Sequence, residues 1–186
     1  MTQTPIKLSF EEYLTYDDGT ENRYELVDGE LVLMPPATGK HEAIITLLLI
    51  RFYLEIQRLG LDWQVRPSGT GVRTSRGKSR LTDLYVITAQ QKQEIENTSA
   101  VLQSPPLLVV EVVSPESVKR DYEQKPAEYA AIRIPEYWIV DPLLNKVSVL
   151  LLVDGSYQTA KFSGNDRIIS QTFPELALTV DLVLSA

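Results

Sequence analysis

The sequence of 186 residues contains no cysteine and a single histidine, His41. The absence of cysteine excludes disulfides, cysteine-ligated zinc, iron–sulfur clusters and thiol catalysis. One histidine also excludes a metal site built from several histidines of one chain. A metal bound by this protein would therefore have oxygen ligands, which suits magnesium, manganese or calcium.

Long apolar runs and an excess of positive charge are also missing. The longest apolar stretch, residues 43–50, is interrupted by Thr46 and is far shorter than the roughly 20 residues that span a bilayer. Residues 1–10 lack the basic and apolar segments of a secretory signal, so we expect a cytoplasmic protein that does not contact membranes. The net charge of −7 argues against a protein that simply wraps nucleic acid.

Length and apolar patterning predict one domain over residues 1–186. Asp-Gly pairs at 28–29 and 154–155 lie between apolar runs and predict two β-hairpins. Residues 40–59 form the clearest helical pattern, and the apolar run 107–113 is typical of a central strand covered on both faces. The predicted order is β-β-α-β-β-β-α-β-α-β-β-β, an α/β or α+β sheet with helices packed on it.

Glu111 is a lone carboxylate within the most apolar strand. Burying an ionised carboxylate costs several kcal/mol unless it is paired or binds a cation. Pairing with a buried arginine or lysine is one interpretation of Glu111. A second carboxylate, Asp83, lies on another predicted strand, and if the two strands are neighbours the carboxylates face each other. With the carbonyl of Val112 they would form an oxygen-rich site that suits Mg²⁺ or Mn²⁺.

Several strings along the chain resemble a known family. They are Tyr-Glu-Leu-Val-Asp-Gly-Glu at 24–30, Thr-Asp-Leu at 82–84, Glu-Val-Val-Ser-Pro at 111–115 and Glu-Tyr-Trp-Ile-Val-Asp-Pro at 136–142. Together with His41 and the series Asp121, Lys125 and Tyr129, they are similar to the Uma-two family of bacterial endonucleases. That family belongs to the restriction-endonuclease-like superfamily, with its Asp…(Asp/Glu)-x-Lys signature. The resemblance implies a mixed β-sheet flanked by helices, with extra hairpins, and a metal-dependent phosphodiesterase centre.

The sequence departs from the superfamily pattern at the lysine. The position two residues after Glu111 is Val113, and the resemblance implies that Lys125 on the following helix takes the role. Asp121, Lys125 and Tyr129 are four residues apart and share one helix face. The alternative is an ordinary exposed Asp–Lys pair, and Pro126 threatens the helix that carries it.

Two further residues are supporting candidates near the predicted centre. Glu25 is a candidate metal ligand or hydrogen-bond acceptor, with an exposed hairpin charge as the alternative. His41, at the start of the long helix, is expected to contact a phosphate or a carboxylate, with a purely structural hydrogen bond as the alternative.

Residues 63–82 contain no acidic residue, and their cations predict a mobile basic hairpin beside Asp83 that contacts the DNA backbone: Arg66, Arg73, Arg76, Lys78 and Arg80. The alternative is a solvated loop. The segment 71–79 resembles a phosphate-binding P-loop, but its glycine spacing is one residue too long and a strand follows, so we expect no nucleotide cofactor.

The sequence therefore predicts a Mg²⁺- or Mn²⁺-dependent DNA endonuclease in which Asp83 and Glu111 hold the metal and Lys125 assists. The alternatives are a non-cleaving nucleic-acid-binding domain or a protein-interaction domain of the same fold. Five consecutive apolar residues at 149–153 and the pair Leu143-Leu144 predict a homodimer.

Overall fold

The computed structural model describes residues 7–186 and contains two β-sheets. The expectation of no secretory signal concerns a segment that lies mostly outside these residues. The larger sheet has the order β11-β10-β9-β8-β6-β3, with strands β3 (Gln64–Pro67), β6 (Leu84–Ile87), β8 (Leu108–Val112), β9 (Glu136–Asp141), β10 (Lys146–Val153) and β11 (Ser156–Ser163). The smaller sheet has the order β2-β1-β5-β4-β7, with strands β1 (Tyr24–Val27), β2 (Glu30–Leu33), β4 (Gly71–Ser75), β5 (Lys78–Leu81) and β7 (Val101–Leu102).

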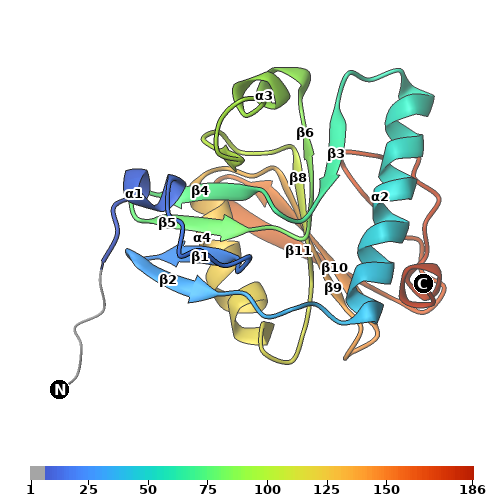
Figure 1. The fold of residues 1–186 in the computed structure, drawn as a ribbon. Coiled ribbons are helices and arrows are strands. Elements are labelled where there is room, and N and C mark those ends of the chain that lie inside the picture. Colours follow the sequence, from blue (N-terminus) through green and yellow to red (C-terminus); the bar gives the residue numbers. More distant parts are fainter. Residues whose placement is uncertain (1–6) are drawn as a thin grey trace.

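The larger sheet is mixed, as the sequence predicts. β8 and β9 run parallel, and the other neighbours in this sheet are antiparallel. The division into two sheets was not predicted. The hairpins β1–β2 and β4–β5 join each other through β1 and β5, and they form a layer beside the larger sheet rather than extending it (Figure 1).

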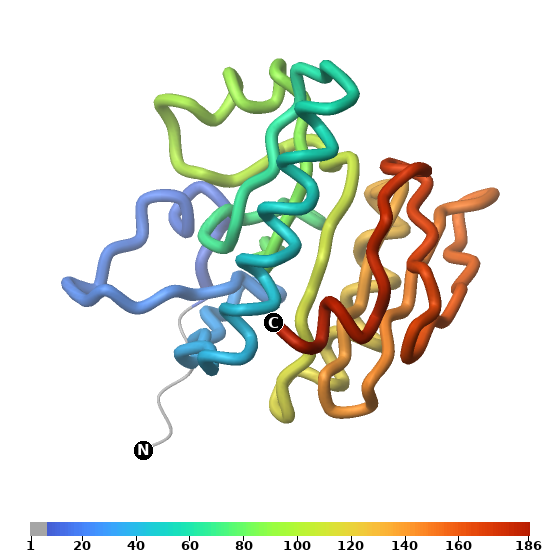
Figure 2. Tube along the Cα trace, turned by 90° about the vertical axis from the view of Figure 1, so that its right-hand side faces the viewer, coloured from blue at the N-terminus to red at the C-terminus, as the bar shows by residue number. Residues whose placement is uncertain are grey.

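The helices are α1 (Phe10–Leu14), α2 (Gly39–Leu59), α3 (Ala89–Glu94), α4 (Lys125–Ala131), α5 (Val180–Leu184) and a π-helical turn, η1 (Arg120–Gln124). α2 and α5 pack on one face of the larger sheet and α4 on the other, whereas α1 packs against the smaller sheet. The predicted helix at residues 40–59 is confirmed as α2, which begins after the capping side chain of Thr38 and ends at Gly60 with a φ of 64°. Figure 2 shows α2 and the C-terminal segment running along the same side of the molecule.

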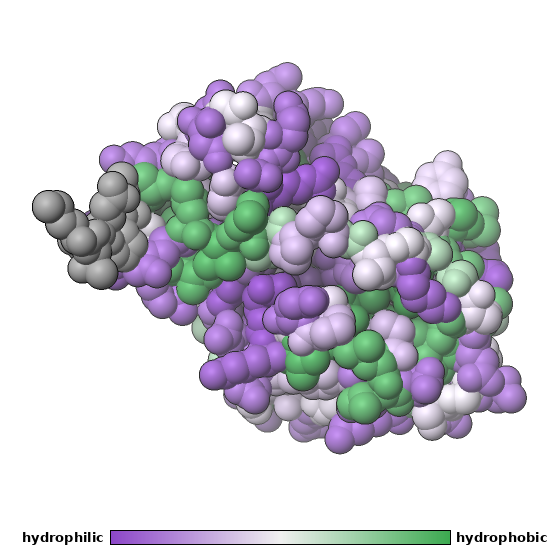
Figure 3. Space-filling view, turned by 60° about the horizontal axis from the view of Figure 1, so that its bottom comes forward, coloured by the Kyte–Doolittle hydropathy of each residue, from purple (hydrophilic) through white to green (hydrophobic). Residues whose placement is uncertain are grey.

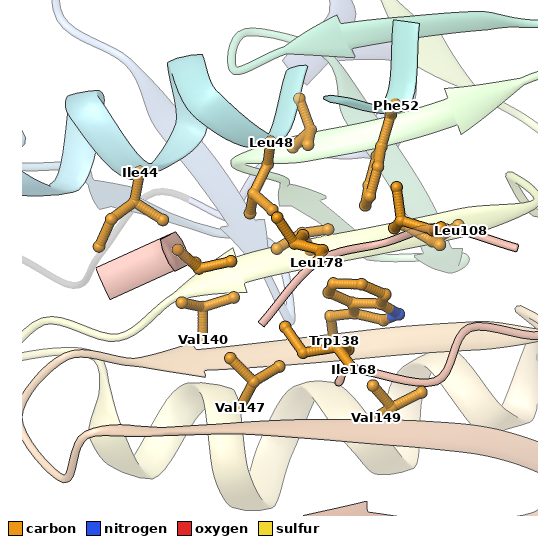
Figure 4. Packing of buried hydrophobic residues seen from close by; sticks show 14 of the residues in the cluster. Ile44, Leu48, Phe52, Leu108, Trp138, Val140, Val147, Val149, Ile168 and Leu178 are labelled. Atoms are coloured by element: carbon orange, nitrogen blue, oxygen red, sulfur yellow. The ribbon is translucent and has the colours of Figure 1, made fainter. Parts of the chain in front are cut away.

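The main core lies between α2 and one face of the larger sheet (Figure 4). Ile44, Leu48 and Phe52 project from the helix at helical spacing toward the sheet. The ring of Phe52 packs edge-on against Trp138 of β9, with ring centroids 5.4 Å apart. This packing fixes α2, and with it His41 in the first turn of the helix, against the sheet.

The opposite face of the larger sheet carries a second core, which α4 covers. Alternate residues of β6 and β8 point to opposite faces, so Leu84 and Val110 face α2 whereas Tyr85 and Val109 belong to the second core. By the same alternation Glu111 faces α4. The most apolar strand thus presents its one carboxylate to the helix that follows it.

Both predicted Asp-Gly hairpins are present. Asp28 and Gly29 have φ angles of 51° and 87°, and Asp154 and Gly155 have φ angles of 50° and 84°. Two consecutive residues with positive φ make the turn that suits the twist of an antiparallel pair.

The surface is mixed in character. Figure 3 shows apolar areas separated by hydrophilic side chains on one face of the molecule. Leu143 and Leu144, in the turn between β9 and β10, are 51% and 63% exposed. Within residues 7–186, every helix is too short or too polar to cross a membrane.

Candidate active site

Glu111 lies at the centre of a buried polar cluster between β8 and α4. Its side chain is 2% exposed. Lys125 Nζ is 2.8 Å from Glu111 Oε2, and the hydroxyl of Tyr129 donates to Oε1 at 2.8 Å. The structure therefore brings Lys125 to Glu111, and the alternative of an exposed Asp–Lys pair is wrong.

Lys125 is shared among three carboxylates. Besides Glu111, its Nζ lies 3.3 Å from Asp121 Oδ1 and 3.8 Å from Glu25 Oε1, and the side chain is 4% exposed. Burial alone would lower the pKa of Lys125, but the charges of Glu111, Asp121 and Glu25 raise it above its usual value. Lys125 is therefore held as a permanent cation in the interior.

The helix before Lys125 adapts to Pro126 by a π-helical turn over Arg120–Gln124. A proline inside an α-helix has no amide hydrogen, and its ring clashes with the carbonyl four residues earlier. Here the backbone N–H of Lys125 donates to the carbonyl of Arg120, five residues back. Pro126 then stands in the first turn of α4, where it is tolerated. The predicted helix is thus confirmed in two pieces, and Lys125 keeps its reach to Glu111.

Asp83 lies immediately before β6, at the point where the chain passes from the smaller sheet to the larger one. β6 pairs with β8 from Leu84 and Val110 onward, so the register, continued by one residue beyond β6, brings Asp83 toward Glu111 of β8. Asp83 Oδ2 accepts a hydrogen bond of 2.8 Å from the backbone N–H of Val112. The side chain of Asp83 is 22% exposed, so it is the more open of the two carboxylates.

His41 reaches Asp83 from the first turn of α2. Its Nε2 lies 3.1 Å from Asp83 Oδ2. Burial alone would lower the pKa of His41, but the hydrogen bond to Asp83 and the negative charge of that carboxylate raise it above its usual value. Of the two roles predicted for His41, contact with a carboxylate is the one that the structure contains.

Glu25 and Arg80 connect the smaller sheet to this cluster. Glu25 is completely buried, which rules out the exposed hairpin charge. It accepts hydrogen bonds from Arg80 Nη1 at 2.9 Å and from the backbone N–H of Leu81 at 3.2 Å. Arg80 also makes a bidentate pair with Glu128, at 2.8 and 2.6 Å. Arg80 is 2% exposed, so the prediction that it contacts a DNA backbone is wrong.

The other predicted DNA-contacting cations lie on or beside ordered strands. Lys78 is a partly buried partner of Glu128 and Asp28, and Arg73 stacks on the ring of Phe10. Arg66 is half-buried and donates to Gln64, whereas Arg76 is exposed in the β4–β5 turn. Of this set, Arg76 is the residue that is most open to a phosphate.

The charges around Lys125 suit an additional cation. Five acidic side chains belong to the cluster and its neighbours, against three permanent cations: Glu25, Asp83, Glu111, Asp121 and Glu128 against Lys78, Arg80 and Lys125. Burial raises the pKa of Glu111 well above its usual value; Lys125 opposes this, whereas Asp83 and Asp121 add to it. A divalent cation between Asp83 and Glu111 would compensate this negative charge.

The oxygen donors near Glu111 would suit Mg²⁺ or Mn²⁺ in a shell that water completes, rather than a metal whose ligands all come from the protein. Within residues 7–186, no three histidine or acidic side chains are grouped as a metal cage. Mg²⁺ commonly takes one or two carboxylates and completes its shell with water and phosphate oxygens. Asp83, Glu111 and the carbonyl of Val112 are the oxygen donors that would contribute to such a shell.

Sequence reasoning missed Glu128 and the internal role of Arg80. Nothing in the spacing of Glu128 marks it as the anchor of an arginine 48 residues away. One feature of the sequence indicated that Arg80 is buried: it lies on a predicted strand, three residues before Asp83. The surrounding Gly, Ser and Thr residues favoured a loop instead.

Comparison with known proteins agrees with this architecture. The chain superimposes on the crystal structure of "a putative nuclease belonging to DUF820" from Anabaena variabilis with a TM-score of 0.79 and 18% sequence identity, over 96% of this chain and 98% of that one. This likeness confirms the fold. No curated protein matches the sequence. The family model Uma2, described as "Putative restriction endonuclease", matches residues 10–181, and the chain therefore belongs to the Uma2 family.

Proposed function

We propose that this protein is a metal-dependent endonuclease that hydrolyses phosphodiester bonds in DNA. The observation that carries the proposal is that Asp83 accepts a hydrogen bond from Val112, the residue after Glu111 on β8, while Lys125 Nζ lies 2.8 Å from Glu111. Membership of the Uma2 family supports a nuclease.

Asp83, Glu111 and the carbonyl of Val112 are the proposed ligands of Mg²⁺ or Mn²⁺. A metal bound there would polarise a phosphate and lower the pKa of a water molecule. His41 holds Asp83 through its Nε2, and the amide of Val112 fixes the same carboxylate oxygen. Both contacts use Asp83 Oδ2, so neither of them occupies Oδ1, which is the oxygen that we propose for the metal.

Lys125 supplies a fixed positive charge next to the proposed metal ligands. Phosphodiester cleavage builds negative charge on the phosphate oxygens, and a preorganised cation stabilises that charge without reorganising in the transition state. Glu25 takes a supporting position, because it contacts both Lys125 and Arg80. The remaining candidates for contact with the DNA backbone are Arg66, Arg73, Arg76 and Lys78.

The proposal is tested by metal titration and by cleavage of supercoiled plasmid with Mg²⁺ or Mn²⁺. Asp83→Asn and Glu111→Gln should each abolish cleavage and weaken Mn²⁺ binding in calorimetry, because each removes a negatively charged ligand. Lys119→Ala, an exposed lysine that precedes the π-helical turn, should retain wild-type activity.

Absence of Mn²⁺ binding by the wild-type protein would contradict the metal-dependent mechanism. It would favour a protein-interaction domain instead. Metal-independent DNA binding without cleavage would favour a catalytically degenerate DNA-binding domain.

We also propose that residues 1–186 form a single domain, because the candidate site takes Glu25 from the smaller sheet and Glu111 from the larger one. We further propose a cytoplasmic homodimer, since cutting both strands of a duplex needs two centres. The exposed Leu143 and Leu144 support the dimer. Light scattering should give twice the chain mass of 21.0 kDa at micromolar concentration, and the mass of one chain would count against the dimer.

A further inference from the structure

A cavity of about 310 Å³ lies beside the smaller sheet, and its lining contains none of the carboxylates of the buried acidic cluster. It opens between the end of α1, the start of β1 and the segments that lead into β4 and β7. Its lining includes Tyr13, Tyr16, Asn22, Arg23, Tyr24 and Gly69. Such a volume is at the small end of the range that ligand sites occupy.

Internal contacts hold the tyrosine rings of this cavity in place. The hydroxyl of Tyr13 donates to the carbonyl of Tyr24 at 2.9 Å, and the hydroxyl of Tyr24 donates to Asp18 Oδ2 at 2.6 Å. Tyr16 packs edge-on against Tyr24, with ring centroids 5.8 Å apart and planes at 89°, and is itself 42% exposed. The rings form a preformed aromatic surface, which is what a stacked base requires.

Arg23 adds a cation to the aromatic lining. It is exposed, and among residues 7–186 no carboxylate oxygen lies within 4.0 Å of its guanidinium nitrogens. A Cβ at Gly69 would meet Arg23 Nη1 at 3.9 Å, so the guanidinium lies over a glycine and is not crowded by a side chain. The amide of Asn22 adds donor and acceptor groups of the kind that read base edges. Aromatic rings with a free arginine and an amide are the combination that recognises unpaired nucleotides.

The cavity is close to the proposed cleavage centre along the chain. Leu81 lines the cavity and its backbone N–H donates to Glu25. Asp83 is two residues further on, so the Cα atoms of Leu81 and Asp83 are at most about 7 Å apart. Successive nucleotides of a stacked strand advance about 3.4 Å, which makes this separation comparable to two nucleotides.

We propose that this cavity binds the base of an unpaired nucleotide close to the phosphate that is cut, and that Arg23 contacts the phosphate of that nucleotide. The inferred substrate class is nucleic acid with a single-stranded segment, because a base within a duplex must first be unpaired and unstacked to enter the cavity, at a cost in free energy. The inference rests on the proposed function, because that function gives the position of the cleavage centre. The binding of a base in the cavity does not depend on it.

The test is binding of a short fluorescein-labelled DNA strand, and of the same strand in a duplex, to the full chain in EDTA. Fluorescence anisotropy should show that the single strand binds at least about tenfold more tightly than the duplex. Tyr16→Ala should weaken single-strand binding about tenfold, which corresponds to the loss of one stacked base. Arg23→Ala should weaken it by a similar factor and reduce its salt dependence.

Two control variants remove an exposed tyrosine and an exposed cation elsewhere on the surface. Tyr53→Ala removes an exposed tyrosine of α2, and Lys161→Ala removes an exposed cation of β11; both should bind as the wild type does. Equal binding by Tyr16→Ala, Tyr53→Ala and wild type would overturn the inference, as would equal affinity for the strand and the duplex.

Cleavage with Mn²⁺ separates this inference from the proposed function. If the wild-type protein cuts DNA and single-strand binding does not depend on Tyr16 or Arg23, the proposed base-binding site is refuted and the proposed nuclease activity stands. A protein that binds single strands through these residues but cuts no DNA refutes the nuclease and leaves the cavity as a binding site.

Discussion

Replacing Lys125 by methionine should strongly destabilise the fold at neutral pH. Methionine retains most of the side-chain volume but removes the charge that contacts Glu111, Asp121 and Glu25 at 2.8, 3.3 and 3.8 Å. Truncating one partner of a buried ionic group typically costs about 3–5 kcal/mol, because the remaining charges are left uncompensated. We expect a loss of this size in the free energy of unfolding, measured by urea denaturation at about pH 7.

The pH dependence of Lys125→Met distinguishes electrostatics from packing. Without the lysine, the pKa of the buried Glu111 carboxyl group rises further, so the folded state holds a proton that the unfolded state releases above about pH 4.3. The deficit relative to wild type should therefore be smaller at about pH 5 than at about pH 8. Lys119→Met, on an exposed site, should change stability by less than about 0.5 kcal/mol. A deficit of less than about 1 kcal/mol, or one that is constant with pH, would refute the assignment of Lys125 as a shared internal cation.

Three further predictions follow from single contacts. His41 is the sole histidine, so its NMR titration is unambiguous; its midpoint should lie above 6.5 and fall in Asp83→Asn, and the stability gained from the protonated ring should be lost as pH rises through that midpoint. Glu136→Ala should cost about 3 kcal/mol in denaturant unfolding, because the buried carboxylate accepts an indole N–H at 2.7 Å and two side-chain hydroxyls at 2.7 Å. Gly71→Ala should cost about 1–3 kcal/mol, since its Cβ would be 2.7 Å from a neighbouring hydroxyl oxygen, whereas Gly39→Ala, with open space, should gain about 0.5–1 kcal/mol; equal thermal midpoints for the two would contradict this.

The parts of the fold that local chemistry determines were predictable. The Asp-Gly turns at 28–29 and 154–155, the capping box of α1 and the long helix α2 depend on neighbouring residues, and all are present. The place of Glu111 on a covered strand also follows from its apolar neighbours. The contact between Glu111 and Lys125, in contrast, was predicted through the family resemblance, because helical spacing alone favours an ordinary exposed Asp–Lys pair.

Features that depend on distant partners were not predictable. Arg80 pairs with Glu25 and Glu128, which are 55 and 48 residues away, so nothing close to it in the sequence distinguishes it from an exposed cation. The separation of the smaller sheet from the larger one was not predictable for the same reason. β1 meets β5 at the pair Leu26 and Ser79, and short strands carry too little local pattern to choose their neighbours.

The π-helical turn has a consequence for how this chain can vary in length. A π-helical turn holds one residue more than an α-helical turn, so removing one residue between Arg120 and Gln124 would leave an α-helical turn there, in which the ring of Pro126 clashes with the carbonyl four residues before it. Inserting a residue would instead rotate Lys125 and Tyr129 by about 100° away from Glu111. Surface loops tolerate length changes at low cost, but the number of residues between Ser117 and Tyr129 is fixed by the geometry of the cluster. We therefore expect a one-residue insertion or deletion in the π-helical turn to weaken both the Lys125–Glu111 ion pair and the Tyr129 hydrogen bond to Glu111.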